Sequence, residues 1–271
     1  MSAEGSPAGW LLLRGLTRDR RHWGDFPERL RAALPAGSVV AAPDLAGNGE
    51  RWLEPSPTSV AAMVEDARAQ ASELGLLDRP GRSVGLRLVA MSLGAMVAIE
   101  WARRYPAELA GLVLINTSVR PLSPLWHRLQ PRAWPTVLGA LARPGDVPGL
   151  QRRVLTLTSR RWRPDEAAGA ELLAQWVAWQ RTCPVQPANA LRQLWAAARY
   201  RAPVRRPAVP IRLLNGAGDR LVHPACSAAL AQAWGLPLHR HPEAGHDLPL
   251  DDPGWVVAQV LASLGEDSAS A

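Results

Sequence analysis

A serine stands at the apex of a short turn in residues 88–96, which read LVAMSLGAM. Ser92 follows an apolar run typical of a buried strand and precedes a segment with helical spacing. A strand-to-helix turn this tight strains the serine backbone and requires small neighbours, which Ala90, Gly94 and Ala95 provide. The turn exposes the hydroxyl, and the N-terminus of the following helix aims backbone N–H groups at a developing oxyanion. Ser92 is therefore a candidate nucleophile.

A serine hydroxyl also needs a base, and the base needs an acid that orients it. Asp219 ends the stretch NGAGD, directly after an apolar run at residues 211–214. His246 lies in PEAGHD, directly after the next expected strand. Both side chains would then lie at the carboxyl ends of strands, and the chain order nucleophile, acid, base is that of one known fold.

Competing interpretations exist for the serine and for the base. A serine in S-x-G with small neighbours also occurs as a simple helix cap. His223, His239 and His241 are alternative bases, but His239 and His241 alternate along an expected strand. His223 precedes a proline at an expected helix start, which favours a structural role.

Three further carboxylates, Asp247, Asp251 and Asp252, compete with Asp219 for the orienting role. They adjoin the candidate base in sequence, and we expect them to begin the last helix rather than to fold back onto the imidazole.

The elements that must position these residues are short apolar runs ended by turn residues. They lie at residues 10–13, 39–42, 86–90, 112–115 and 211–214, and residues 238–241 could add a last strand. Segments with helical spacing separate several of them, as at residues 60–71, 95–102 and 256–261. Strand and helix in alternation predict an α/β protein with a mostly parallel sheet of about six strands flanked by helices.

The middle of the chain differs in composition. All 31 basic residues are arginine, and residues 120–206 hold 15 of them against four acidic residues, a net charge of +11 where the whole chain has +7. Six of the 12 tryptophans also lie there, the spacing is helical, and strand-like runs are absent. We therefore expect a first part of the core at 1–119, a helical insertion at 120–206 and a second part of the core at 207–271. We call residues 120–206 the middle segment; it would cover the carboxyl ends of the strands.

Together these residues resemble the α/β-hydrolase fold superfamily, over a stretch from Trp10 to about Leu264. The resemblance is to small esterase-type serine hydrolases with a helical cap, similar to carboxylesterases and carrier-protein methyl ester esterases. It implies that the backbone amides of Leu16 and Leu93 form the oxyanion hole and that the middle segment is the cap.

The sequence departs from the family pattern at three points. Ala90 replaces the first glycine of G-x-S-x-G, and Arg14 replaces the usual histidine before Gly15. Because only nine residues precede Trp10, we also expect the two N-terminal strands of the full fold to be missing.

The resemblance implies a cofactor-free, metal-free serine hydrolase that cleaves a carboxylic ester or thioester through an acyl-enzyme. The net charge of the middle segment favours an anionic small-molecule or acyl-carrier-bound substrate, with Arg14, Trp126 and Trp176 as candidate substrate contacts. C–C bond hydrolysis, haloperoxidase-like chemistry and a non-catalytic binding or scaffold role on the same fold remain alternatives.

Several classes of function are disfavoured by the sequence. No recognition motif accompanies the arginines, which argues against nucleic-acid binding, and no apolar run approaches the ~20 residues of a membrane-spanning helix. Cys183 and Cys226 form no metal or redox spacing. Residues 1–5 lack the features of a signal peptide, so we expect a cytoplasmic protein.

Overall fold

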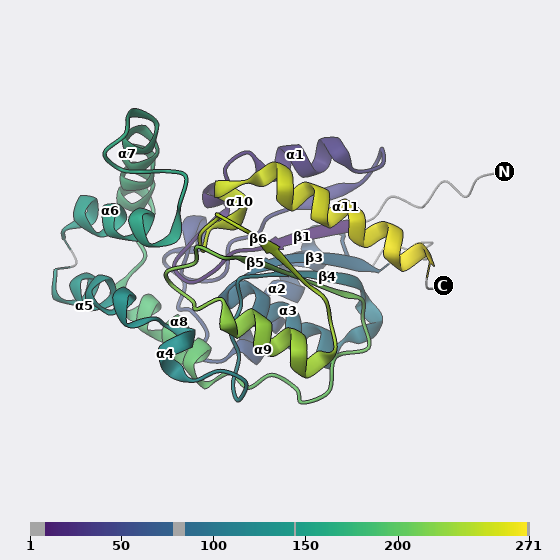
Figure 1. Ribbon diagram of the computed structural model, residues 1–271. Coiled ribbons are helices and arrows are strands. Elements are labelled where there is room, and N and C mark those ends of the chain that lie inside the picture. Colours follow the sequence, from purple (N-terminus) through teal and green to yellow (C-terminus); the bar gives the residue numbers. More distant parts are fainter. Residues whose placement is uncertain (1–8, 78–84, 144, 270–271) are drawn as a thin grey trace.

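Six parallel strands form one sheet in the computed structural model, which describes residues 9–77, 85–143 and 145–269 (Figure 1). Their spatial order is β2-β1-β3-β4-β5-β6. The strands are β1 (Gly9–Leu13), β2 (Val39–Ala41), β3 (Leu86–Met91), β4 (Leu109–Ile115), β5 (Ile211–Gly216) and β6 (Leu238–His241). The five predicted apolar runs form β1 to β5 and residues 238–241 form β6, so the predicted α/β class and strand number are confirmed. The order reverses between β1 and β3, where open parallel sheets bind ligands beyond their carboxyl ends.

Helices cover both faces of this sheet. On one face α1 (Phe26–Ala33) packs against α11 (Pro253–Ala269), and on the other lie α2 (Val60–Glu73), α3 (Leu93–Arg104) and α9 (Ala225–Trp234) (Figure 1). Short helical turns complete the connections: η1 (Arg20–Trp23), η2 (Gly49–Arg51), η3 (Pro106–Glu108) and α10 (Leu248–Asp251).

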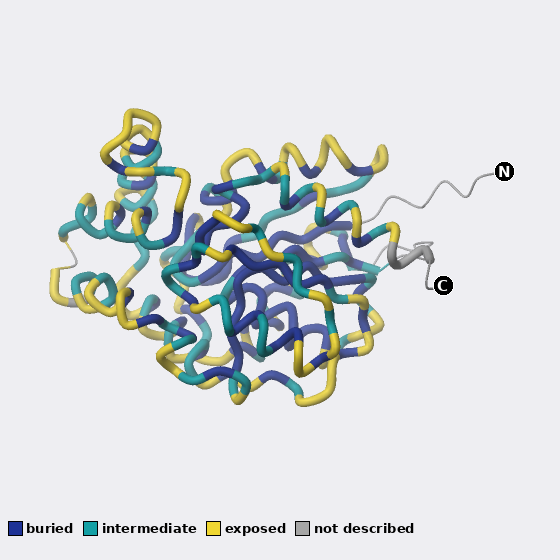
Figure 2. Tube along the Cα trace, in the orientation of Figure 1, coloured by how far each residue is buried: buried dark blue, intermediate teal, exposed yellow. Residues whose placement is uncertain are grey.

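The buried core follows the two-residue period of the strands. Leu11 and Leu13 of β1 point into the cluster that contains α2 and α3, whereas Trp10 and Leu12 point toward α1 and α11. Because both faces are covered, strand residues of either set are buried, and the strands appear dark along the centre of Figure 2. This rigid layer fixes the ends of β3, β4, β5 and β6, from which the candidate site is built.

The middle segment forms helices beside the sheet (Figure 1). They are α4 (Leu125–Arg128), η4 (Pro131–Ala133), α5 (Trp134–Ala142), α6 (Val147–Thr158), α7 (Ala167–Thr182) and α8 (Pro187–Arg199). The two ends of the segment meet, since the Ala202 amide donates a hydrogen bond of 2.9 Å to the Arg120 carbonyl.

Buried polar side chains of α8 fasten the middle segment to the core. The Gln193 amide nitrogen donates to Asn48 Oδ1 and Ser56 Oγ, both at 2.9 Å. Gln193 Oε1 in turn accepts from the Thr17 amide at 2.8 Å. One glutamine of the middle segment therefore holds the loop that follows β1.

No helix in the described parts of the chain is both long and apolar enough to cross a membrane. Residues 1–5, on which the expectation about targeting rests, lie outside the described residues.

Candidate active site

Ser92 occupies the turn between β3 and α3. Its backbone has φ +56° and ψ −116°, a left-handed conformation that is unfavourable for a residue with a Cβ. The turn is held because the Ser92 amide donates to the Ile115 carbonyl of β4 at 2.9 Å, and Leu93 begins α3 directly afterwards. Strain at a residue fixed by its surroundings is typical of functional positions.

The small residues around Ser92 are required by close backbone approach. A Cβ on Gly94 would lie 2.3 Å from the Leu13 carbonyl oxygen, so no larger residue fits without moving β1. A Cβ on Gly15 would lie 3.0 Å from the Cβ of Ser92 itself. The family pattern has its first glycine at position 90. Alanine replaces it here without a clash, because Ala90 fits as a fully buried residue of β3.

Asp219 and His246 meet at the ends of β5 and β6. The imidazole Nδ1 donates to Asp219 Oδ2 at 2.7 Å, with both side chains buried. The other carboxylate oxygen, Oδ1, accepts from the amides of Leu221 at 2.8 Å and Val222 at 2.9 Å. Three donors therefore fix the carboxylate, and the carboxylate fixes the imidazole with Nε2 available as an acceptor.

Asn116 connects these strand ends, a role that the sequence analysis missed. Its side-chain nitrogen donates to the His246 carbonyl at 2.7 Å, and its oxygen accepts from the Gly216 amide at 2.9 Å and the Asn215 side chain at 3.0 Å. The signal in the sequence is the change from the apolar run of β4 to polar residues, of which Asn116 is the first. Asn116 has φ +47°, which asparagine tolerates better than most residues.

Ser92 and His246 border one cavity of about 350 Å³ between the sheet and the middle segment. Gly15 and Leu16 line it from the loop after β1. The opposite wall is apolar and comes from α5, α6 and α8, with Val137, Leu150, Val154, Leu157, Leu191 and Leu194. An apolar pocket with a few polar groups at one end suits a ligand with a carbon chain.

The two predicted oxyanion donors lie beside Ser92. Leu16 lines the cavity and Leu93 is the first residue of α3. Within the described residues, neither backbone amide donates to a protein acceptor. Both N–H groups are therefore free to bind a developing negative charge, the requirement for an oxyanion hole.

Arg14 borders the cavity, but its charge is already compensated. Its guanidinium donates two hydrogen bonds to Asp247, at 2.7 and 3.0 Å, and both side chains are only 3% exposed. Burial would raise the pKa of Asp247, but the Arg14 charge holds it below its ordinary value. The structure thus gives Arg14 a partner instead of leaving it as a free cation for substrate.

The two tryptophans suggested as substrate contacts lie elsewhere. Among the described residues neither Trp126 nor Trp176 lines this cavity. Trp126 is 60% exposed, and Trp176 is buried, with its ring 5.2 Å from that of His22 and 4.4 Å from the Arg18 guanidinium. Tryptophan content alone did not distinguish packing from ligand contact.

The competing acids have separate structural roles. Only Asp252 caps the N-terminus of the last helix, α11, where its side chain accepts from the Trp255 amide at 2.9 Å. Asp251 instead accepts from the Gly245 amide at 2.7 Å and from Ser159 and the Arg160 amide of the middle segment. The expectation that all three carboxylates start that helix was wrong for Asp247 and Asp251, because long-range donors bind them.

The competing histidines also have local partners. His241 Nδ1 accepts from the amides of Glu243 and Ala244, and His223 Nδ1 accepts from the Ala225 amide. His223 also stacks on His127 with ring centroids 4.5 Å apart.

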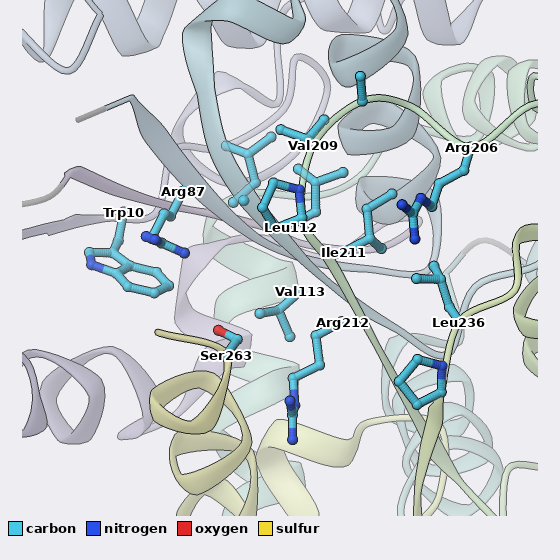
Figure 3. A pocket seen from close by; sticks show the side chains of 15 residues that line it. Trp10, Arg87, Leu112, Val113, Arg206, Val209, Ile211, Arg212, Leu236 and Ser263 are labelled. Atoms are coloured by element: carbon cyan, nitrogen blue, oxygen red, sulfur yellow. The ribbon is translucent and has the colours of Figure 1, made fainter. Parts of the chain in front are cut away.

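A second cavity, of about 590 Å³, lies at the opposite ends of the strands (Figure 3). Arg87, Ile211 and Arg212 line it, near the start of β3 and β5. It is larger but remote from Ser92, and parallel α/β sheets bind ligands at the other end. Among the described residues no group of three or more His, Cys, Asp or Glu side chains is placed to hold a metal ion.

Comparisons with known proteins agree with this architecture. A family model described as "Alpha/beta hydrolase family" matches residues 10–259. The chain is 31% identical over 248 residues to a pimeloyl-[acyl-carrier protein] methyl ester esterase of Aromatoleum aromaticum, covering 85% of this chain and 90% of the relative.

Solved structures share the fold at lower sequence identity. A thermophilic esterase from Thermogutta terrifontis is 23% identical with a TM-score of 0.69, covering 97% of this chain and 91% of the other. The enol-lactonase from Burkholderia xenovorans is 18% identical with a TM-score of 0.75, covering 97% and 94%.

Proposed function

Because the chain belongs to the alpha/beta hydrolase family, we propose that it hydrolyses a carboxylic ester, or a thioester, through an acyl-enzyme on Ser92. The observation on which this rests most is the buried 2.7 Å contact between Asp219 and His246, in a cavity that Ser92 also borders. No cofactor or metal is part of this chemistry.

In the proposed reaction His246 Nε2 accepts the Ser92 proton while Oγ attacks the ester carbonyl carbon. The carbonyl oxygen becomes an oxyanion, which the amides of Leu16 and Leu93 bind. When the carbon–oxygen bond to the alcohol breaks, His246 returns the proton to the leaving oxygen. A water molecule, whose proton His246 accepts, then attacks the carbonyl carbon of the acyl-enzyme. The bond to Ser92 Oγ breaks, His246 returns the proton to Oγ, and the acid is released. Asp219 holds the imidazole in one tautomer throughout.

The cavity suggests which part of the substrate it binds. Its apolar wall from α5, α6 and α8 faces the serine, so we assign it to the acyl chain and treat the middle segment as the cap of the site. The substrate is then a small-molecule ester, or the acyl end of a carrier-bound ester such as the one named for the Aromatoleum relative.

Exposed arginines of the middle segment support an acidic carrier as partner. Arg132, Arg160 and Arg163 of the middle segment are exposed, and their charges add to burial in lowering the pKa of Arg220, which follows Asp219. These four arginines therefore form one cluster across the cap and the core. Within this cluster Arg163 has an exposed partner, Glu166, at 3.7 Å. Arginines of the segment outside the cluster also have partners: Arg153 pairs with Asp146 at 3.3 Å, and Arg161 donates to the Asp251 carbonyl.

The arginine cluster can be tested through ionic strength. Changing Arg132 and Arg160 to Gln should lower kcat/KM for a carrier-bound ester and weaken its salt dependence, because surface attraction is screened above about 0.1 M. A small neutral ester should be unaffected. Arg29→Gln, which removes an exposed arginine of α1 paired with Asp25, is the matched control. Equal salt dependence for both esters would contradict a role for the cluster.

The nucleophile is tested by labelling with a fluorophosphonate and by hydrolysis of short p-nitrophenyl esters. Ser92→Ala should remove the label and lower kcat on the order of 10³-fold or more, because nucleophile and base act as a unit. Ser227→Ala, a buried serine of α9 outside the cavity, should behave as wild type. Wild-type protein that neither takes the label nor hydrolyses any ester would favour a non-catalytic binding role.

A further inference from the structure

Three charged side chains border the cavity beside Ser92 and His246: Arg14, Arg18 and Asp247. Arg14 and Asp247 neutralise each other in their buried pair. Arg18 is the charge that remains, so this wall of the cavity has a net charge of +1. The sequence analysis did not single out Arg18, which lies four residues after Arg14 in the same loop.

Arg18 is held rigidly by groups from both the core and the middle segment. Its Nη1 donates to His22 Nε2 at 3.0 Å and to Gln151 Oε1 of α6 at 2.9 Å. The guanidinium also lies over the ring of Trp176, 4.4 Å from its centroid. A side chain fixed by two acceptors and an aromatic ring loses little further entropy when it binds a ligand.

The protonation state of His22 supports this arrangement. Burial, and then the Arg18 charge, lower the pKa of His22 to about 4. A neutral His22 can donate from Nδ1 to Asp19 Oδ1, 3.1 Å away, and accept from Arg18 at Nε2. Asp19, His22 and Arg18 therefore form a hydrogen-bonded chain that ends at the cavity.

The other terminal nitrogen of Arg18 lacks such a partner. Nη2 is buried and makes no hydrogen bond within the described residues. Burial, and then the Arg14 charge, lower the pKa of Arg18 to about 10, so the side chain stays charged at neutral pH. A buried donor left unpaired on a cation is costly, and an anion that reaches Nη2 from the cavity would satisfy it.

We propose that Arg18 binds a carboxylate of the substrate, so that the site takes esters that bear a free carboxylate at the far end of the acyl chain or on the alcohol. This deepens the proposed function and rests on it. A carboxylate fits better than a phosphate group, because the wall offers one net positive charge, whereas a phosphate carries up to two negative charges. The remaining lining of α5, α6 and α8 suits the carbon chain.

The test compares monomethyl esters of linear dicarboxylic acids with methyl esters of monocarboxylic acids of the same length. Wild type should prefer the half-esters, most strongly at one chain length, because the cation is fixed in place. Arg18→Met should lower kcat/KM for the half-esters about ten- to a hundredfold, mainly through KM, and leave the neutral esters within about threefold. Arg18→Lys, which keeps the charge, should recover part of the preference.

Arg20→Met is the matched control, because Arg20 lies in the same turn but is half exposed and pairs with Glu50. A purely structural role for Arg18 would lower kcat/KM for both ester series equally in Arg18→Met and Arg18→Lys, and that result would overturn the proposal. Equal preference for both series by wild type would also overturn it.

Binding measurements separate this proposal from the proposed function. Calorimetry with Ser92→Ala and a linear dicarboxylate needs no turnover. Weaker binding after Arg18→Met, again by about ten- to a hundredfold, supports the proposal even where wild type hydrolyses neither ester. Unchanged binding, or binding lost equally in Arg20→Met, contradicts it.

Discussion

Replacing Asp219 with asparagine tests the proposed triad most sharply, because the structure dictates how the new amide must lie. Oδ1 of Asp219 accepts from the amides of Leu221 and Val222, and Oδ2 accepts from His246 Nδ1. In the variant the amide oxygen stays with the two backbone donors, and the NH2 group faces Nδ1. The imidazole must then accept at Nδ1 and hold its proton on Nε2, the atom that should take the proton from Ser92.

The opposite orientation of the amide would direct its NH2 group at two buried N–H donors. Each backbone donor left unpaired costs about 1–3 kcal/mol, so the unproductive orientation is favoured by roughly 2–6 kcal/mol. The population of the productive tautomer then falls by roughly 30-fold to more than 10⁴-fold. Loss of the carboxylate charge, which stabilises the imidazolium, acts in the same direction.

The assay is kcat for p-nitrophenyl esters at neutral pH, with thermal unfolding of each variant measured alongside. Asp219→Asn should keep a folded structure and lose about 10³-fold or more of kcat. Asp252→Asn is the control, since that side chain caps α11 and is 42% exposed, and it should stay within about twofold. A loss of less than tenfold in Asp219→Asn would refute Asp219 as the orienting acid.

Three further outcomes are expected. Asp247→Asn should lower the free energy of unfolding by about 3 kcal/mol, because it leaves the Arg14 guanidinium buried without its counter-charge; urea titration measures this, and adding Arg14→Met should recover part of the loss. The pKa of His22 is lowered to about 4, so between pH 6.5 and 4 the unfolded chain binds a proton that the folded chain does not, and the free energy of unfolding should fall by up to about 3 kcal/mol as the pH is lowered over that range. His22→Gln should flatten this part of the plot of stability against pH, and an unchanged slope would show that another group causes the acid sensitivity. Asn116→Ala should lower both the free energy of unfolding, by about 2–4 kcal/mol, and kcat, because it unpairs the Gly216 amide and releases the loop of His246. Wild-type kcat and wild-type stability in this variant would show that the loop keeps its conformation without Asn116.

The strands and the serine turn could be predicted because their signals are local. A buried parallel strand needs a short, nearly continuous apolar run, and the five runs that form β1 to β5 satisfy this within four or five residues. Gly94 was predictable for the same reason, since a close approach of backbone admits only a small residue. The placement of Asp219 and His246 at one edge of the sheet could be predicted because each residue comes shortly after an expected strand, β5 or β6.

The network around the site could not be predicted because its partners are far apart in the sequence. Arg14 and Asp247 are separated by 233 positions, and Arg18 and Gln151 by 133. Asp251 likewise binds Ser159 of the middle segment, 92 positions away. A residue count gives the sum of charges, but only the fold determines which charges neutralise each other.

This distinction separates two ways in which arginine can act at one site. Arg132, Arg160 and Arg163 are exposed, so their attraction for an acidic partner acts through water and is screened over about 8 Å at physiological salt. Arg18 lies in the cavity with a buried, unpaired nitrogen, so its interaction with a carboxylate is screened much less. The exposed cluster should therefore govern how fast a carrier associates, and Arg18 should govern which acyl group stays bound. Raising the salt concentration should remove the first effect and leave the second, because only the first depends on charges that the solvent reaches.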